Sequence, residues 1–141
     1  MPITLELTAK PAEADLALIS KGLTDYNAAD VGPSGRVALA IIIRDAAGEI
    51  AGGLSGYTAW GWLYVQWLWL SEPLRGQGLA GRLLSMSEAE AIKRGCHGAY
   101  IDTFNPAALR VYQRQGYAVF GELADFPKGR TRSFLQKSLS S

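Results

Sequence analysis

Apolar positions recur along the chain with two periods, which divide it into ten expected elements. Spacing by three and four residues is typical of a helix that buries one face, whereas alternation or a short apolar run is typical of a strand. The expected order is a strand at 3–8, a helix at 11–23, strands at 37–44, 49–57 and 61–70, a helix at 78–94, a strand at 99–104, a helix at 106–116, and strands at 117–123 and 131–139. This order predicts a mixed α/β fold with a largely antiparallel sheet flanked by helices.

The two longer helices carry the clearest periodicity. The first is expected from the apolar positions Ala12, Leu16, Ile19 and Leu23. The second is expected from Leu79, Leu83, Met86, Ala89 and Ile92. Between Tyr26 and Arg36 the sequence contains Asn, Asp, Gly, Pro and Ser, so we expect a loop or a broken helix there.

The most informative segment joins the third of the expected central strands to the second helix. Arg75, Gly76 and Gly78 lie in this connection, and Arg82 lies in the first turns of the helix. Glycine lets backbone N–H groups approach a ligand closely, and the first helical turn leaves unpaired donors at the positive end of the helix dipole. The segment therefore predicts a binding site for phosphate or pyrophosphate.

One interpretation of this segment is a dinucleotide site. Residues 76–81 read G-x-G-x-x-G, and Asp102 lies 21 residues beyond Gly81, where a ribose-binding carboxylate is expected. Against it, residues 71–75 separate the strand from the first glycine, and 39 residues after Asp102 are too few for a six-stranded doubly wound sheet. An NAD-dependent oxidoreductase remains an alternative.

A second interpretation rests on two motifs. Residues 75–80, Arg-Gly-Gln-Gly-Leu-Ala, resemble the R/Q-x-x-G-x-G/A loop of the GCN5-related N-acetyltransferases, the GNAT family. Residues 105–117 resemble that family's N-x-x-A-x-x-x-Y-x-x-x-G-F/Y segment, with Asn105, Ala108, Tyr112 and Gly116 in register. The resemblance spans roughly residues 37–139 and implies the acyl-CoA N-acyltransferase (GNAT) fold.

The resemblance also implies how a cofactor is held. The backbone of Leu68, Trp69 and Leu70 would pair with the pantetheine arm of acetyl-CoA, on a strand that splays from its neighbour at a bulge. The pyrophosphate would be held by Arg75, Gly76, Gln77, Gly78, Leu79, Ala80, Gly81 and Arg82. Asn105 would bond to the pantetheine arm, beside which Ala108 would pack, although Asn105 is equally suited to capping the helix that follows.

The implied reaction is transfer of the acetyl group to a primary amine of a small molecule or peptide, by direct attack in a ternary complex. A backbone N–H near Leu70 would stabilise the oxyanion, and Tyr112, in contact with the cofactor, would protonate the departing thiolate. The base is unassigned, because Gln66 stands on the strand where many relatives carry a glutamate. Glu72, Asp102 and Asp125 are the available carboxylates. A non-catalytic acyl-CoA sensor or partner-binding protein of the same fold is the other alternative.

Composition limits the classes of partner and cofactor that we expect. A chain of 141 residues is expected to form one domain, residues 1–141, and its net charge of +1 gives no reason to expect nucleic acid or an anionic membrane as a partner. Cys96 is the single cysteine, which excludes an internal disulfide and any cysteine-based metal cluster, and we expect no metal. The N-terminus does not resemble a signal peptide, so we expect a cytoplasmic protein. The family resemblance makes a homodimer the expected assembly.

Overall fold

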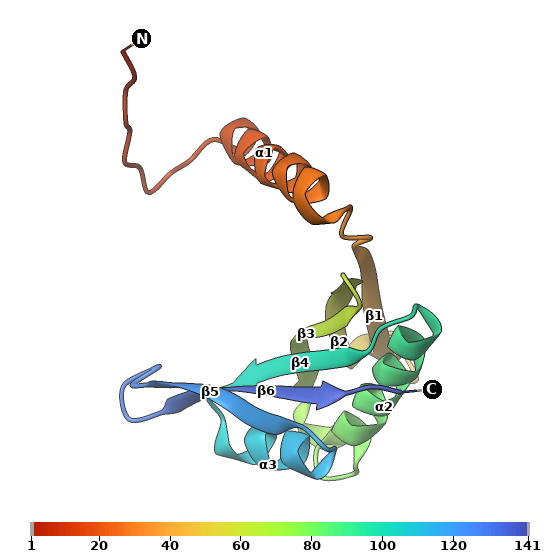
Figure 1. Ribbon diagram of the computed structural model, residues 1–141. Helices are drawn as coiled ribbons and strands as arrows, with labels where there is room; N and C mark the ends of the chain where they lie inside the picture. Colours follow the sequence, from red (N-terminus) through yellow and green to blue (C-terminus); the bar gives the residue numbers. More distant parts are fainter. Residues whose placement is uncertain (1, 141) are drawn as a thin grey trace. The chain divides into compact units, whose positions relative to one another are not determined.

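The computed structural model describes residues 2–140, which form a six-stranded sheet with helices (Figure 1). The elements are α1 (Glu13–Val31), β1 (Val37–Arg44), β2 (Ile50–Ala59), β3 (Trp62–Leu70), the 3₁₀ turn η1 (Glu72–Leu74), α2 (Leu79–Lys93), β4 (Gly98–Thr103), α3 (Pro106–Arg114), β5 (Ala118–Ala124) and β6 (Thr131–Ser138). The strand order is β1-β2-β3-β4-β6-β5, and β3 and β4 are parallel whereas the other neighbours are antiparallel. The expected mixed α/β fold is confirmed.

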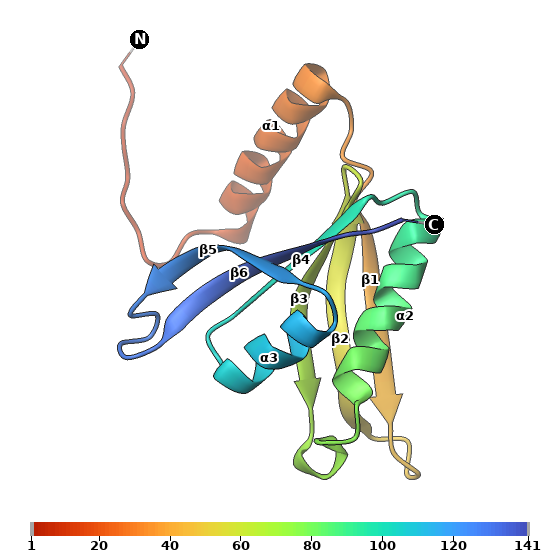
Figure 2. The ribbon, with the colours of Figure 1, turned by 60° about the horizontal axis from the view of Figure 1, so that its bottom comes forward.

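The chain divides between Ser34 and Gly35 into two compact units. The second unit holds the whole sheet, with α2 and α3 on one of its faces (Figure 2). Its core contains Leu63, Leu84 and Leu135, each with no exposed surface. Burying a leucine contributes about 1.5–3 kcal/mol, so this apolar layer fixes both helices against the sheet. None of the helices described is both long and apolar enough to cross a membrane.

A bulge in β3 separates it from β4. Val65 pairs with Gly56 of β2 and Trp67 pairs with Ser55, so Gln66 is an extra residue on β3. A Cβ at Gly56 would collide with the carbonyl oxygen of Tyr64, so the bulge needs a glycine at this position. Within residues 2–140, the β3–β4 pairing runs from Trp62 to Val65 and then ends. The expected splay is therefore present.

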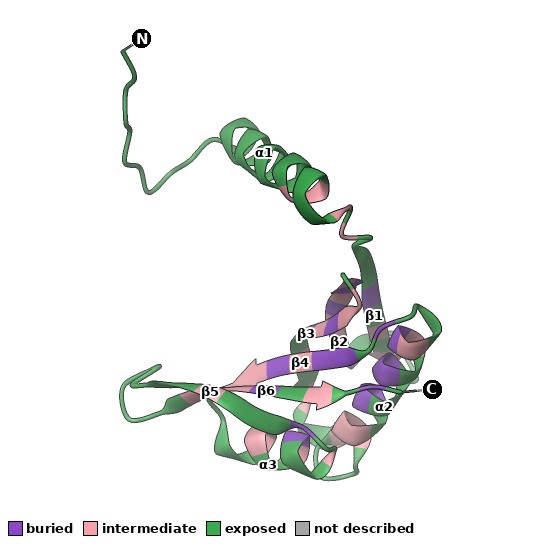
Figure 3. Cartoon of the chain, in the orientation of Figure 1, coloured by how far each residue is buried: buried purple, intermediate pink, exposed green. Residues whose placement is uncertain are grey.

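The first unit contains α1, which differs from the sequence expectation. The helix does not break at Tyr26 but continues to Val31, because Ala28 and Ala29 favour helix and the first strong stop is Gly32-Pro33. No residue of α1 is buried, and Figure 3 shows the helix as exposed along almost all of its length.

The strand expected at residues 3–8 is absent from the structure described. This segment has no regular secondary structure, and its residues are exposed. Alternation of apolar and polar residues indicates a preference for pairing, but a strand forms only where a second strand supplies its hydrogen bonds. The expected strand at 3–8 was therefore wrong for the chain as the structure describes it.

Candidate active site

The glycine loop before α2 leaves its backbone donors open. Gly76 and Gly78 have φ values of 76° and 75°, and a Cβ built on either would meet no atom within 4 Å. The first bond within α2 runs from the N–H of Arg82 to the carbonyl of Gly78, at 3.2 Å. The N–H groups of residues 79–81, in the first turn, therefore have no acceptor within the helix. This arrangement suits an anion.

Two side chains brace this loop from within. Arg75 donates from Nε to the carbonyl of Leu70 at 3.0 Å, and Gln77 donates from Nε2 to the carbonyl of Pro73 at 2.8 Å. These contacts tie the loop to the end of β3 and to η1. Arg82 is exposed on the first turns of α2. In sequence, Arg75 precedes and Arg82 follows the residues that carry these donors.

The splay of β3 exposes the backbone that the resemblance assigns to pantetheine. Among the described strands, residues 67–70 pair with β2 alone, so the edge of β3 that faces β4 is open there. Leu68 and Leu70 turn into the core, whereas Trp67 and Trp69 are 67% and 55% exposed on the opposite face. A ligand lying along this edge would meet polar backbone between apolar side chains.

Asn105 begins α3 as an N-cap, as its sequence position predicts. Its Oδ1 accepts hydrogen bonds from the N–H groups of Ala107 and Ala108, at 2.8 and 3.1 Å. Pro106 follows at the first helical position, where its missing N–H costs nothing. The capping function occupies the side-chain oxygen and does not use the amide NH₂ in these bonds. Contact of that NH₂ with a ligand remains a prediction.

Tyr112 lies on the same helix, with its side chain buried to 6% exposure. Burial, and to a lesser degree the negative charge of Asp102, raises the pKa of Tyr112 to about 12. The hydroxyl therefore holds its proton at neutral pH, which a proton donor requires.

Asp102 lies on β4, at the point where its pairing with β3 has ended. It directly follows Ile101, the last residue of β4 paired with β3. Its Oδ1 accepts from Arg132 at 2.8 and 3.0 Å, and its Oδ2 accepts from the Tyr64 hydroxyl at 3.2 Å. Sequence reasoning missed Tyr64 and Arg132, because neither stands in a motif.

The two other candidate carboxylates have different surroundings. Glu72 opens the exposed turn η1. Asp125 has a left-handed backbone, with φ of 56°, and its Oδ1 accepts from the N–H of Gly129 at 3.2 Å, which closes the β5–β6 loop. The Asp125 bond is of a kind that shapes loops, and Glu72 stands on an exposed turn, so Asp102 is the stronger candidate for a role at the splay.

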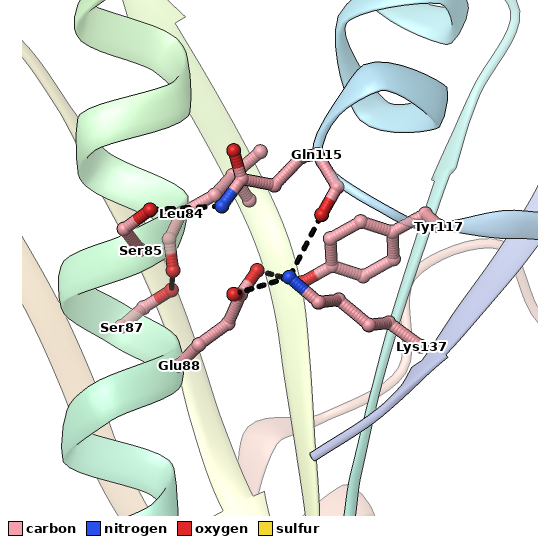
Figure 4. Close-up of polar contacts among 7 residues, drawn as sticks. All are labelled: Leu84, Ser85, Ser87, Glu88, Gln115, Tyr117 and Lys137. Atoms are coloured by element: carbon pink, nitrogen blue, oxygen red, sulfur yellow. Dashed lines mark hydrogen bonds and ion pairs between the residues drawn. The ribbon is translucent and has the colours of Figure 1, made fainter. Parts of the chain in front are cut away.

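A partly buried polar cluster links the two helices of this site (Figure 4). Glu88 of α2 accepts from Lys137 Nζ at 2.7 Å and from the Tyr117 hydroxyl at 2.9 Å. Lys137 also donates to the carbonyl of Gln115, and the Gln115 side chain donates to Ser85 Oγ of α2, at 2.7 and 2.8 Å. We call these five residues the Glu88 cluster. It fixes α2, which carries the glycine loop, against the end of α3, which carries Tyr112.

Comparison with known proteins assigns this chain to a class of acetyltransferases. The model of the acetyltransferase (GNAT) family matches residues 12–117. The chain therefore belongs to the GNAT family of acetyltransferases, which use acetyl-CoA.

Individual relatives agree with this assignment. The chain is 50% identical to acetyltransferase Atu2258 of Agrobacterium fabrum over 126 residues. This alignment covers 89% of this chain and 91% of the relative. It is 42% identical over 93 residues to the blasticidin-S acetyltransferase of Streptomyces morookaense, covering 65% and 68%. The crystal structure of an acetyltransferase from Agrobacterium tumefaciens matches with a TM-score of 0.94 at 44% identity, over 97% of this chain and 100% of that one.

The dinucleotide interpretation of the glycines is wrong. β3, α2 and β4 form a parallel strand-helix-strand unit, which explains why the spacing fits, but the rest of the sheet is antiparallel. Asp102, the expected ribose ligand, is bound to Arg132 and Tyr64 instead. The family match makes this chain an acetyltransferase rather than an oxidoreductase.

Proposed function

We propose that this protein, acting as one domain, transfers the acetyl group of acetyl-CoA to a primary amine of a small molecule by direct attack in a ternary complex. The observation that carries the proposal is the meeting of three features in one unit: open donors at the start of α2, open backbone on β3, and a buried, protonated Tyr112 on α3. Acetyl-CoA supplies the thioester, and these three features form the site that would bind it.

The pyrophosphate would lie on the N–H groups of residues 79–81, between Arg75 and Arg82. Helix N-termini and the surrounding backbone donors stabilise such anions without any side-chain rearrangement. The backbone of Leu68, Trp69 and Leu70 would pair with the pantetheine arm. Gly76, Gln77 and Gly78 would let the loop approach the phosphates, while Asn105 and Ala108 would contact the far side of the arm.

In the reaction, the amine nitrogen attacks the carbonyl carbon of the thioester and a C–N bond forms. The C–S bond then breaks, and the Tyr112 hydroxyl gives its proton to the departing sulfur. A backbone N–H near Leu70 stabilises the oxygen that becomes negative in between. The proton lost by the amine passes to solvent, which also restores the Tyr112 proton. Atoms and charges balance without any further reactant.

Asp102 is poorly suited to act as the base at the splay. Its ion pair with Arg132 engages one carboxylate oxygen, and Tyr64 donates to the other. A carboxylate whose two oxygens are both engaged, one of them by a cation, has little tendency to take a proton from the amine. We therefore expect the amine to lose its proton to water, so that kcat/KM rises with pH until the amine's own pKa.

A small molecule is the favoured acceptor. The relative from Streptomyces morookaense is named for acetylation of blasticidin-S, and this chain is 42% identical to it. Exposed aromatic residues stand near the splay, with Trp67 and Trp69 on β3 and Phe104 after β4. They offer flat apolar surfaces to a compact ligand. We also propose a homodimer, and a cytoplasmic site of action, where a lone thiol such as Cys96 stays reduced.

The experiment is a calorimetric titration of the ligand-free protein with acetyl-CoA, followed by release of free CoA across a panel of small-molecule amines. We expect micromolar binding and turnover with at least one amine. Tyr112→Phe should keep the Kd for acetyl-CoA and lower kcat about 10²-fold or more, because one proton donor is lost. Tyr100→Phe removes the hydroxyl of a half-buried tyrosine on β4 and serves as the control.

Three outcomes would contradict parts of the proposal. Tight binding of acetyl-CoA without turnover on any amine would support an acyl-CoA sensor of the same fold. No binding would refute the assignment of the glycine loop. An unchanged kcat in Tyr112→Phe would remove this tyrosine from the reaction.

A further inference from the structure

The point at which β3 and β4 separate is spanned by side chains. Among residues 2–140, Val65 of β3 and Ile101 of β4 form the last backbone pair between the two strands. Tyr64 comes directly before this pair on β3, and Asp102 comes directly after it on β4. The Tyr64 hydroxyl donates to Oδ2 of Asp102 at 3.2 Å. A side-chain hydrogen bond thus joins the two strands where their backbone ladder stops.

The other oxygen of the Asp102 carboxylate is held from β6. Nε and Nη2 of Arg132 both donate to Oδ1 of Asp102, at 3.0 and 2.8 Å. The side chains of Asp102 and Arg132 are 18% and 28% exposed, so water screens this ion pair less than one on the open surface. We call Tyr64, Asp102 and Arg132 the Asp102 network. It links three strands, because β4 lies between β3 and β6 in the sheet.

Aromatic rings hold the two partners of Asp102 in place. The Tyr64 ring stacks on that of Tyr100, with ring centroids 4.6 Å apart and an interplanar angle of 10°. The Arg132 guanidinium lies 4.7 Å from the ring centroid of Phe126. Stacked rings and cations over rings both gain stabilisation that depends on their geometry. The two partners therefore have defined positions, and they fix the carboxylate in turn.

The position of this network affects both halves of the proposed site. Beyond it, residues 67–70 of β3 offer the open backbone that would pair with the pantetheine arm. Asp102 also acts on Tyr112, because its negative charge contributes to raising the pKa of that hydroxyl. The width of the splay would therefore decide where the thioester lies relative to the donor near Leu70 and to Tyr112. A misplacement of about 1 Å can cost about 10²-fold in rate.

We propose that Asp102 is a positioning residue for acetyl transfer: held by Tyr64 and Arg132, it fixes the separation of β3 and β4 and so aligns the thioester. The inference rests on the proposed function and gives a role to three residues outside the two motifs. Two other roles for this carboxylate lead to different expectations. A base would work best when freed from Arg132, whereas a positioning residue needs the ion pair intact. A docking charge for the amine would act on the KM of the amine and leave acetyl-CoA binding unchanged.

The test compares the binding of two ligands to variants of the whole chain. Acetyl-CoA would use both the glycine loop and β3, whereas ADP carries a diphosphate without a pantetheine arm and would use the loop alone. Tyr64→Phe, Asp102→Asn and Arg132→Met should each weaken acetyl-CoA binding about fivefold or more, as for the loss of a hydrogen bond, and leave the inhibition constant of ADP unchanged. Partial unfolding would weaken both ligands equally, so the ratio of the two constants separates positioning from stability.

Turnover with an amine from the panel gives a second readout. The kcat should fall about 10–10²-fold in Asp102→Asn and Arg132→Met, and less in Tyr64→Phe, which keeps the ion pair and the stacked ring. Arg132→Lys keeps the positive charge and should recover part of the loss. As a control, Glu90→Gln breaks a comparable ion pair with Arg94 on α2, at 2.9 Å, and should change neither kcat nor the ratio.

Three results would overturn the proposal. Unchanged acetyl-CoA affinity and kcat in all three variants would leave the Asp102 network with a structural role. Loss of kcat in Asp102→Asn with full kcat in Arg132→Met would make Asp102 a base, and a rise in the amine KM alone would make it a docking charge. Tyr64→Phe, the mildest change, decides the question if the charged variants do not fold. A parent protein that binds neither acetyl-CoA nor ADP would refute the proposed function instead.

Discussion

The first and third turns of α2 differ in whether their polar groups find hydrogen-bond partners within the protein. At the first turn, Gly78 provides no side-chain cap, and the N–H groups of residues 79–81 have no acceptor within the helix. Two turns later, Glu88 is 7% exposed and accepts hydrogen bonds from both Lys137 and Tyr117. The first turn thus leaves its donors to solvent or a ligand, whereas the third turn satisfies its carboxylate within the protein.

The difference teaches how to separate binding from folding in this protein. Substitutions in the glycine loop should change the affinity for acetyl-CoA and spare the fold. Substitutions in the Glu88 cluster should change the stability and spare the intrinsic affinity of folded molecules. Each prediction below either breaks this separation or makes it more exact.

The largest expected effect comes from placing an anion in the loop. Gly78→Glu should abolish measurable binding of acetyl-CoA, because a carboxylate would occupy the space before the open donors and repel the pyrophosphate. The new Cβ meets no protein atom within 4 Å, but Gly78 has a φ of 75°, so glutamate at this position should cost about 1–2 kcal/mol of stability and lower the melting temperature. Calorimetry and a thermal melt measure the two quantities.

The matched control is Gly78→Asn. Asparagine tolerates the left-handed backbone that Gly78 adopts, and it adds no charge. It should retain binding with reduced affinity. If Gly78→Glu bound acetyl-CoA normally while folded, the loop would not hold the phosphates and the comparison above would fail.

The glycine loop could be predicted from sequence because backbone geometry, rather than a contact, dictates its residues. Gly76 and Gly78 both adopt positive φ, and Asn105 with Pro106 starts α3 where their types require. The Glu88 cluster could not be predicted, because its members lie 29 and 49 residues apart and no local pattern reports such pairs.

The N-terminal segment shows a second limit. The alternation at residues 3–8 predicted a strand and the spacing at 11–23 predicted a helix with an apolar face, but residues 3–8 form no strand and no residue of α1 is buried. These patterns did not indicate which surface would cover the apolar residues, since periodicity carries no information about the partner. The end of α1 was also missed, because two alanines extend a helix through residues typical of loops.

The next largest effect tests the Glu88 cluster. Lys137→Met leaves the Glu88 carboxylate buried with the Tyr117 hydroxyl as its remaining partner in the cluster, which should cost about 3–5 kcal/mol of unfolding free energy. The Kd for acetyl-CoA, corrected for the folded fraction, should not change. Denaturant unfolding and titration below the melting temperature measure the two.

Two further variants sharpen this result. Glu88→Gln/Lys137→Met removes both charges and should be less destabilised than the sum of the single variants. Lys21→Met breaks an exposed ion pair with Asp25 on α1 and should leave the melting temperature unchanged. A loss of affinity in folded Lys137→Met would show that the cluster also shapes the binding site.

Alkaline pH should lower the free energy of unfolding through the buried and half-buried tyrosines. Burial raises the pKa of Tyr112 and of Tyr100 to about 12 and also raises that of Tyr117. Above pH 10, tyrosines in the unfolded chain lose their protons first, so the folded state binds more protons there. The free energy of unfolding therefore falls as pH rises from about 10 to about 12. Urea unfolding across this range measures the slope.

Single variants identify the tyrosine responsible for each part of that slope. Tyr112→Phe removes one titrating group and should flatten the decline, whereas Tyr26→Phe, with a ring 70% exposed, should not. A stability curve that stayed level to pH 12 would show that these hydroxyls are more accessible to water than their burial indicates.

The smallest expected effect concerns Asn105, whose side-chain oxygen caps α3 and whose NH₂ group is predicted to contact the ligand. Asn105→Ala removes the cap on α3 and should cost about 1 kcal/mol of stability. Asn105→Asp keeps an oxygen for Ala107 and Ala108 but loses the NH₂ donors. If that amide contacts the pantetheine arm, the aspartate variant should melt like the parent and bind acetyl-CoA roughly fivefold more weakly, as expected for one hydrogen bond of about 1 kcal/mol. Equal affinity in the parent and the aspartate variant would leave Asn105 as a helix cap alone and restrict cofactor recognition to the glycine loop and β3.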